Sequence, residues 1–418
     1  MSSLLLDLGG SYIKTATVSA GSFQLENVTR WPMPELQTEN LQRRVLRVKQ
    51  LRPLIDLAVN EALRLDQTIR RIFISGQMGC WFLAAVDTQP DWIVSWQDLR
   101  SLEQFASLDE AIQFFDLPNL ITANGNEIGL GVPVVGLLCE LRNHERLDVP
   151  LRFGTLLSWC ADFLTATSSS VIHVTDAAST GLLDLEKRDW HHLITGGLKV
   201  PISWPRICCE VVPVGTLEGT DIEVFCGVGD QQASLLGANL SSDRLIVNIG
   251  TGGQVAALGV SKLHERVKRR PFFNEELIST VTHLPSGRYL KEALRLGTLS
   301  WGSEISFAQL DNLQESYLGQ DNAITIDMLR DLAFVVRYAQ TNSIDEFLNL
   351  FVDLMAREYI EAINRLIKPE HSEIRFAGGV GQKCSPLTMR IASSFQGLKS
   401  SIATVQETTL AGLADFHT

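Results

Sequence analysis

The chain has 418 residues, of which 45% are hydrophobic and 20% charged, a composition typical of a folded globular protein. This length exceeds what one compact core usually organises, so we expect two domains of roughly 150–250 residues each. With 48 acidic and 36 basic residues the formal net charge is −12, which argues against nucleic-acid binding, because that depends on cationic neutralisation of phosphates.

The N-terminal segment predicts a β-hairpin. The apolar run 4–8 contains one carboxylate, Asp7; a glycine turn at 9–11 interrupts the run, and 12–18 resumes as a strand. A carboxylate inside an apolar strand needs partners, so Asp7 is a candidate for chemistry, with a structural role as the alternative. No basic segment precedes the apolar run, so a secretion signal is not expected.

Two further segments in the first third carry candidate functional side chains. A strand over 71–75 is expected to end at the glycine-containing turn 76–79, with 81–86 as its return strand. The segment 96–100 is Trp-Gln-Asp-Leu-Arg, which combines an aromatic ring with donors and acceptors suited to sugar hydroxyls. The alternative for this segment is an exposed turn with a surface ion pair.

Membrane insertion and disulfide cross-linking are both unexpected. The longest nearly apolar run, 128–139, has 12 residues and contains Pro133, so it is too short to span a bilayer. The seven cysteines are odd in number and show no Cys-x-x-Cys spacing, which disfavours a disulfide framework and a zinc ribbon. We therefore expect a reduced, cytoplasmic protein without membrane or nucleic-acid partners.

A strand starting near residue 223 leads through Gly227 and Gly229 into a predicted helix. Asp230 stands where a helix N-cap would stand, and that structural role is the alternative to a catalytic one.

A second hairpin follows, with strands over 245–249 and 254–258 around the turn 250–253. It aligns without gaps on the first hairpin, and Asp7 falls on Asn248. A repeat at this distance indicates two domains of similar build, which we divide at residue 242. Two unrelated hairpins are the alternative, because glycine turns are common.

The longest predicted helix begins at the capping box Ser343-x-x-Glu346, continues with apolar residues at helical spacing to Leu366, and is stopped by Pro369. We expect it to belong to the core. A strand over 374–377 then precedes another glycine turn, 378–381.

Glycine-bearing strand ends can bring backbone amides close to phosphate oxygens. The sequence has neither a P-loop nor a dinucleotide-binding fingerprint. Phosphoryl transfer requires a metal, a base and donors that fix the phosphates, and Mg²⁺ needs only one or two carboxylates besides water and phosphate oxygens. Asp7 and Asp230 are the two carboxylates that immediately adjoin glycine turns, and they could meet across one cleft.

The order of these motifs resembles that of the FGGY carbohydrate kinases, over nearly the whole chain. The matching segments are 7–11 and 248–252 (phosphate motifs), 75–78 and 96–100 (sugar-binding segments), 229–233 (catalytic aspartate), 378–387 (adenosine motif), 175–180 with Trp190, and 407–412 (last helix).

The resemblance implies an α/β fold of the actin–hexokinase type, in which two ribonuclease-H-like domains flank a cleft. It implies a sugar-binding N-terminal domain over 1–242 and a nucleotide-binding C-terminal domain over 243–418. ATP and Mg²⁺ would be the cofactors, and the partner would be a small sugar. A homodimer is only a base-rate expectation.

The resemblance also implies roles for individual residues. Asp230 would be the catalytic base, and Asp7 and Asp230 would hold Mg²⁺. The substrate-binding residues would be Gln77, Met78, Trp96, Gln97, Asp98 and Arg100. The nucleotide-binding residues would be Gly9, Gly10, Ser11, Lys14, Gly250, Thr251, Gly252, Gly378 and Gly379.

Within the family, Gln77-Met78 is similar to the start of the sugar segment in xylulose and sedoheptulose kinases, although Gly79 replaces the histidine expected there. The resemblance implies transfer of the γ-phosphate of ATP to a primary hydroxyl of a ketose. The alternative is a degraded relative that binds sugar or nucleotide without turnover. A third possibility, an actin-like chaperone or filament ATPase, would not need the 96–100 segment.

Overall fold

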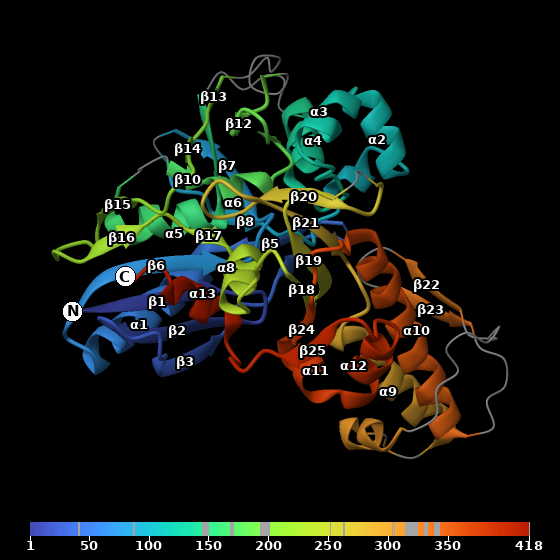
Figure 1. Ribbon diagram of the computed structural model, residues 1–418. Helices are drawn as coiled ribbons and strands as arrows, with labels where there is room; N and C mark the ends of the chain where they lie inside the picture. Colours follow the sequence, from blue (N-terminus) through green and yellow to red (C-terminus); the bar gives the residue numbers. More distant parts are fainter. Residues whose placement is uncertain are drawn as a thin grey trace. The chain divides into compact units, whose positions relative to one another are not determined.

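The computed structural model divides by its contacts into two compact units (Figure 1). The first comprises Met1–Gly237, Arg269–Leu277 and Glu407–Thr418, and the second comprises Ala238–Lys268 and Ile278–Gln406. The structure describes residues 1–40, 42–86, 88–143, 150–167, 171–192, 201–250, 252–261, 264–302, 304, 306–313, 325–329, 333–337 and 343–417.

These units differ in detail from a division at residue 242, because two segments from far downstream pack with the N-terminal part of the chain. The assignment of sugar binding to 1–242 and of nucleotide binding to 243–418 stays a prediction.

The first unit is built on a seven-stranded sheet whose central strand is β6 (Ile69–Gly76). The antiparallel pair β1 and β2 confirms the predicted N-terminal hairpin. Both β1 and β17 run parallel to β6, so the carboxyl ends of these three strands lie at the same edge of the sheet. The other strands are β1 (Ser2–Leu8), β2 (Tyr12–Ser19), β3 (Glu26–Pro32), β15 (Pro213–Thr216), β16 (Glu223–Phe225) and β17 (Val228–Gly229).

Alternation along β1 sends its side chains to two differently packed faces. Leu4, Leu6 and Leu8 are fully buried in a core shared with α1 (Val48–Leu65) and α5 (Leu156–Thr165). Asp7 lies on the opposite face of the strand and is also buried.

The helices α8 (Asp230–Gly237) and α13 (Thr408–Ala414) lie against each other in the first unit (Figure 1). Glycine allows this close approach: a Cβ on Gly412 would lie 1.9 Å from the carbonyl oxygen of Ala233, and one on Gly237 would lie 2.0 Å from that of Thr408. The end of the chain therefore supports the helix that begins at Asp230.

A second sheet of the first unit corrects one sequence-based expectation. The strand β7 (Trp81–Ala85) does not return beside β6 but pairs with β8 and β9. The reason is that β1 already occupies one edge of β6 and β16 with β17 the other. The six strands of this sheet are β13 (Ile202–Ser203), β9 (Leu151–Thr155), β7, β8 (Trp92–Val94), β5 (Arg44–Arg47) and β4 (Gln37–Thr38).

Among its described residues, the first unit also contains short helices and two small strand pairs. These are η1 (Arg100–Glu103), α2 (Leu108–Phe114), α3 (Pro118–Ala123), α4 (Pro133–Asn143), α6 (Val174–Ala178), β10 (Val171–His173) with β14 (Arg206–Cys208), and β11 (Leu183–Asp184) with β12 (Asp189–Trp190).

The second unit repeats the arrangement of the first around its own hairpin. β18 pairs antiparallel with β19 and parallel with β24, as β1 does with β2 and β6, which confirms the second hairpin and the similar build. The sheet contains β20 (Lys268–Pro271), β21 (Leu277–Thr282), β19 (Gly253–Leu258), β18 (Arg244–Ile249), β24 (Glu373–Ala377) and β25 (Lys399–Ile402). The segment Arg269–Leu277, which runs from the second residue of β20 to the first residue of β21, belongs to the first unit.

The predicted core helix is confirmed as α10 (Ile344–Leu366), with Ser343 as its N-cap accepting a hydrogen bond from the amide of Glu346. Its buried face forms the core of the second unit. The other elements are α9 (Gly287–Trp301), η2 (Phe307–Asn312), β22 (Thr325–Leu329), β23 (Ala333–Arg337), α11 (Gly378–Lys383) and α12 (Ser385–Ser393). Within the described part of the chain, no helix is both long and apolar enough to cross a bilayer.

Candidate active site

The register of three strands places the two predicted carboxylates at one edge of the first sheet. Asp7 on β1 lies opposite Ser75 on β6, and Ser75 lies opposite Val228 on β17. Asp230 follows Val228 by two residues and begins α8. Because all three strands run parallel, Asp7 and Asp230 emerge at the same edge.

Asp7 is 3% exposed, and burial raises the pKa of its carboxyl group to about 6 although the nearby charge of Lys14 lowers it. Lys14 Nζ lies 3.6 Å from Asp7 Oδ2 and 2.9 Å from Glu407 Oε2, and Arg30 also pairs with Glu407. Asp7 Oδ1 is buried and has no hydrogen-bond partner among the described residues. One oxygen of the carboxylate is therefore paired and the other is left for a ligand.

Asp230 is electrostatically coupled to Asp7. Burial, and after it the charge of Asp7, raises the pKa of Asp230, while the amide of Gln231 together with Arg270 and Lys14 opposes the rise; the resulting pKa is about 7. Such a pKa lets the group exchange a proton near neutral pH. The structure thus brings together the two carboxylates that adjoin glycine turns in the sequence.

A third buried carboxylate, Asp176 on α6, interacts electrostatically with Asp230, and no role was predicted for it. It is 1% exposed, and Thr155 Oγ1 donates a hydrogen bond of 2.5 Å to its Oδ2. Burial, followed by the charge of Asp230, raises its pKa to about 7. Its only signal in the sequence is its place in the family-like segment 175–180, which contains no glycine turn.

The turn after β6 brings Gln77 and Met78 to this edge. The Gln77 amide N–H donates to Leu8 O at 2.9 Å, and the side-chain Oε1 of Gln77 would lie 3.8 Å from a Cβ on Gly10. Met78 Sδ would lie 2.8 Å from a Cβ on Gly229, the residue before Asp230. Both predicted sugar residues therefore contact the segments that carry Asp7 and Asp230.

The segment 96–100 is less exposed than a surface turn, so that alternative is wrong. Trp96 packs on Gly79, whose added Cβ would lie 3.2 Å from Trp96 Cβ. Gln97 Oε1 accepts a hydrogen bond of 3.3 Å from Arg44. Asp98 and Arg100 are 4% and 5% exposed.

The polar groups of Asp98 and Arg100 have partners inside the protein. Asp98 accepts hydrogen bonds from the amides of Arg44 and Arg100 and from the Arg100 guanidinium, at 2.8–3.1 Å. Arg100 Nη1 also donates to Glu140 at 2.9 Å, and the guanidinium lies over the Trp81 ring. These bonds hold the Trp96-Gln97 turn in place.

The predicted phosphate residues of the first unit surround the β1–β2 turn. Gly10 and Ser11 are exposed and Gly9 is half-buried, while Lys14 stands opposite Asp7 on β2. These residues lie directly after Asp7 in the chain, at the edge that also carries Gln77.

The second unit brings its own glycine turns together. The Gly250 amide donates to Gly252 O at 2.9 Å, and Gly250 O accepts from Gly287 at the start of α9. Gly378 has a φ of +78°, and a Cβ there would lie 2.4 Å from Asn248 Oδ1, so the position requires glycine. Cβ atoms on Gly252 and Gly379 would meet nothing within 4 Å. Thr251 lies outside the described residues.

The chemistry of the donors fits Mg²⁺ better than a metal held by protein alone. Among the residues that the structure describes, no three His, Cys, Asp or Glu side chains cluster so as to hold a metal ion. Mg²⁺ needs only one or two carboxylates when phosphate oxygens and water complete its shell. The partnerless Asp7 Oδ1 and the Asp230 carboxylate satisfy that requirement.

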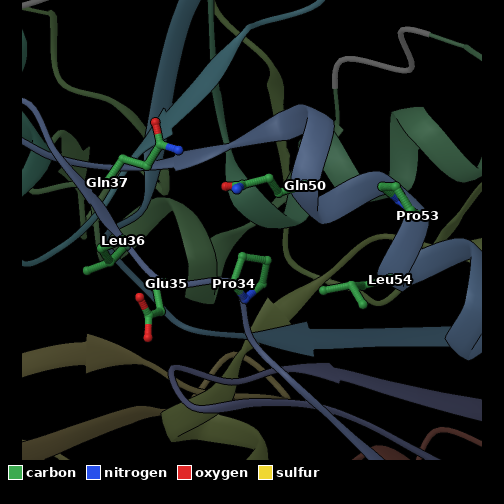
Figure 2. Close-up of a pocket in the computed structure, with 7 residues that line it drawn as sticks. All are labelled: Pro34, Glu35, Leu36, Gln37, Gln50, Pro53 and Leu54. Atoms are coloured by element: carbon green, nitrogen blue, oxygen red, sulfur yellow. The ribbon is translucent and has the colours of Figure 1, made fainter.

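A separate pocket of about 580 Å³ in the first unit contains none of these residues (Figure 2). It lies between the segment after β3 and the first turns of α1. Its lining residues are Pro34, Glu35, Leu36, Gln37, Gln50, Pro53 and Leu54.

No family model matches the chain. A glycerol kinase from Shewanella baltica (strain OS185) is 30% identical over 142 residues, which cover 33% of this chain and 28% of that protein. A xylulose kinase from Lactococcus lactis subsp. lactis (strain IL1403) is 23% identical over 279 residues, which cover 60% of this chain and 51% of that protein. The matches thus span about a quarter to a half of the length of these relatives.

The similarity in structure extends over nearly the whole chain. The crystal structure of a ligand-bound xylulose kinase from Lactobacillus acidophilus superimposes with a TM-score of 0.82 at 16% sequence identity, covering 99% of this chain and 89% of that one. The predicted resemblance is thereby confirmed: this chain has the actin–hexokinase-like fold of the FGGY carbohydrate kinases.

Proposed function

We propose that the protein is an ATP-dependent carbohydrate kinase that transfers the γ-phosphate to a primary hydroxyl of a ketose such as xylulose or sedoheptulose. The main support is the pair Asp7 and Asp230, two electrostatically coupled carboxylates at the carboxyl ends of strands that both pair with β6. The xylulose kinases among its relatives and structural neighbours favour a ketose.

Asp230 serves as the general base. Its pKa of about 7 allows it to take the proton of an acceptor hydroxyl near neutral pH. As the hydroxyl oxygen forms a bond to the γ-phosphorus, the bond between that phosphorus and the β,γ-bridging oxygen breaks, and ADP leaves with the bridging oxygen. The proton remains on Asp230 until solvent removes it.

Asp7 and Asp230 are the residues that would hold Mg²⁺, directly or through water. When bound, the ion neutralises charge on the β- and γ-phosphates. Lys14 pairs with Asp7 Oδ2 and so leaves Oδ1 as the oxygen that can face the ion.

The glycine turns of the two units would bind the nucleotide through backbone amides, which approach phosphate oxygens closely where no Cβ intervenes. In the first unit these are Gly9, Gly10 and Ser11, with Lys14 nearby. In the second unit they are Gly250, Thr251 and Gly252 for phosphates, and Gly378 and Gly379 for adenosine.

Gln77 and Met78 would contact the sugar directly, because they lie beside the segments that carry Asp7 and Asp230. Trp96, which packs on Gly79 next to Met78, and its neighbour Gln97 would contact it as well. For Asp98 and Arg100 we propose a supporting role, since their polar groups are used in holding the Trp96-Gln97 turn. The seven free cysteines fit a reducing, cytoplasmic location.

The deciding experiment is ADP release measured with ATP and Mg²⁺ over a panel of ketoses and polyols. We expect ketoses of five to seven carbons to stimulate release more than glycerol does. An Asp230→Asn variant is the control for catalysis. Nucleotide binding without stimulation by any sugar would overturn this proposal in favour of a relative that binds without turnover.

A further inference from the structure

A buried polar network lies next to Asp230, and apart from the charge of Arg270, which lowers the pKa of Asp230, it has been given no role above. Arg270 Nε lies 2.6 Å from Glu127 Oε2, and Arg270 Nη2 lies 2.9 Å from Glu127 Oε1, so the ion pair is bidentate. Arg270 Nη1 donates a third hydrogen bond to Gln231 Oε1. The three residues are 9%, 3% and 7% exposed. All three belong to the first unit.

The backbone of Glu127 is held in place by hydrogen bonds that do not involve Arg270. Its amide donates to Asn124 Oδ1 at 2.9 Å, and Asn124 Nδ2 donates to the carbonyls of Glu127 and Gly181 at 3.0 and 2.8 Å. The Arg269 amide donates to Gly125 O at 2.8 Å, which ties the two segments together through the backbone. The orientation of the Arg270 side chain is therefore fixed at both ends, by the backbone bond of the neighbouring Arg269 and by the ion pair of its guanidinium.

The segment 269–277 binds the first turn of α8 through two hydrogen bonds. Arg270 bonds the side chain of Gln231, and the carbonyl of Pro271 accepts a hydrogen bond of 3.2 Å from Gln232 Nε2. Gln231 and Gln232 directly follow Asp230. Because Nε and Nη2 of the planar guanidinium are both bound to Glu127, its third nitrogen, Nη1, has little freedom, and its bond to Gln231 sets the position of the helix end.

An ion pair at this depth is a costly way to stabilise a fold. The free-energy cost of removing a guanidinium and a carboxylate from water offsets most of their attraction. Well-packed apolar side chains would therefore stabilise the segment equally well. Unlike apolar packing, the ion pair fixes the orientation of the Arg270 guanidinium. That orientation acts on the helix turn that bears Asp230.

We propose that Arg270, held by Glu127, is a positioning residue for the transfer reaction: it fixes the first turn of α8 so that Asp230 stays where the acceptor hydroxyl must lose its proton. The inference rests on the proposed function for its kinetic part. A misplacement of about 1 Å at a reacting group costs roughly 100-fold in rate, so the effect is measurable.

Four single substitutions and one double variant test the proposal. Arg270→Met removes the fork and keeps much of the apolar stem, Arg270→Lys keeps the charge without the fork, and Glu127→Gln keeps the shape of the anchor without its charge. The matched control is Arg152→Met, because Arg152 forms a comparably buried ion pair with Asp162 in the same unit at 3.1 Å.

We expect Arg270→Met to lower kcat for the best ketose by about 10–100-fold, while the Kd for ADP stays within about twofold. Arg270→Lys should recover part of the loss. Glu127→Gln combined with Arg270→Met should cost no more than Arg270→Met alone, because both changes break one network. Arg152→Met should lower the thermal midpoint but leave kcat near that of the wild type.

Amide hydrogen exchange tests the positioning role of Arg270 even if the protein shows no turnover. The amides at the start of α8 should exchange faster in Arg270→Met than in Arg152→Met at equal distance below their thermal midpoints. A wild-type protein without sugar-stimulated ADP release would overturn the proposed function alone. Unchanged exchange in α8, or wild-type kcat in Arg270→Met, would overturn the positioning role of Arg270.

Discussion

Asp7 and Lys14 stand opposite each other across β1 and β2, and Lys14 Nζ lies between Asp7 Oδ2 at 3.6 Å and Glu407 Oε2 at 2.9 Å. A residue 393 positions from Lys14, at the entry to the last helix, thus shares the cation that pairs with Asp7. The turn between the two strands is the one predicted to bind phosphate. The charge state of this edge therefore depends on both ends of the chain.

This relationship predicts the effect of Lys14→Met. Removing the cation should raise the pKa of Asp7 further and weaken its hold on a metal–nucleotide complex. We expect the KM for MgATP to rise by about tenfold, which steady-state kinetics at varied ATP would detect. Arg30→Met is the matched control, since Arg30 reaches Glu407 but is not paired with Asp7. An equal effect of both changes would contradict a specific role for Lys14.

Asp230→Asn should abolish transfer. Removal of a general base typically costs about 10²–10⁴-fold in rate, while the Kd for ADP, measured by calorimetry, should stay nearly unchanged. Asparagine has nearly the same shape and can keep the first position of α8. If the variant loses nucleotide binding and folded structure together, Asp230 is a structural residue and the assignment of the base is wrong.

The buried carboxylates predict an unusual dependence of stability on pH. Because the pKa of Asp176 is raised from 3.8 to about 7, the folded state binds its proton more tightly than the unfolded state does. The stability that this proton supplies is present below about pH 4 and is lost as the pH rises to about 7.

Asp176→Asn removes that loss, because the amide stays neutral and can still accept from Thr155. We expect the free energy of unfolding in EDTA to rise by about 1–3 kcal/mol at pH 8 and to change little at pH 4. Denaturant titrations at the two pH values would measure this. Asp162→Asn should instead destabilise at pH 8, since it removes the partner of Arg152. A destabilised Asp176→Asn at pH 8 would refute the raised pKa.

Substitutions at the neighbouring Gly378 and Gly379 should distinguish an effect on stability from an effect on nucleotide binding. Gly378→Ala should lower the free energy of unfolding by about 1 kcal/mol or more, because φ is +78° and the new Cβ would meet Asn248 Oδ1. Gly379→Ala has open space and should keep wild-type stability, yet it should raise the KM for ATP if adenosine passes over this backbone. Thermal unfolding together with ATP kinetics distinguishes the two, and equal stability of both variants would be inconsistent with this account.

Local patterns in the sequence were sufficient for several parts of the site. The two hairpins, the helix α10 with its Ser343 cap, and the placing of Asp7 and Asp230 beside glycine turns were all predicted, and the structure contains them. Each depends on strand alternation, helical spacing or a turn residue within a few positions of the chain. The likeness to carbohydrate kinases followed from the order of such local motifs.

Pairings between distant residues were not accessible in this way. The predicted position of β7 was wrong because strands from elsewhere occupy the edges of β6. Asp98 and Arg100 are buried and bond residues distant in the sequence: Asp98 accepts from the amide of Arg44, and Arg100 donates to Glu140. These outcomes depend on which segments compete for one edge or one charge.

Short-range patterns in the sequence are enough to locate the glycine turns and the acidic strand ends of this protein. Two features follow only from how distant segments pack: the buried Asp176 interacts with Asp230, and Arg270 pairs with Glu127, 143 positions away, beside Asp230. Packing decides them because the pKa of a carboxyl group and the orientation of a guanidinium depend on the distant residues that exclude water around them.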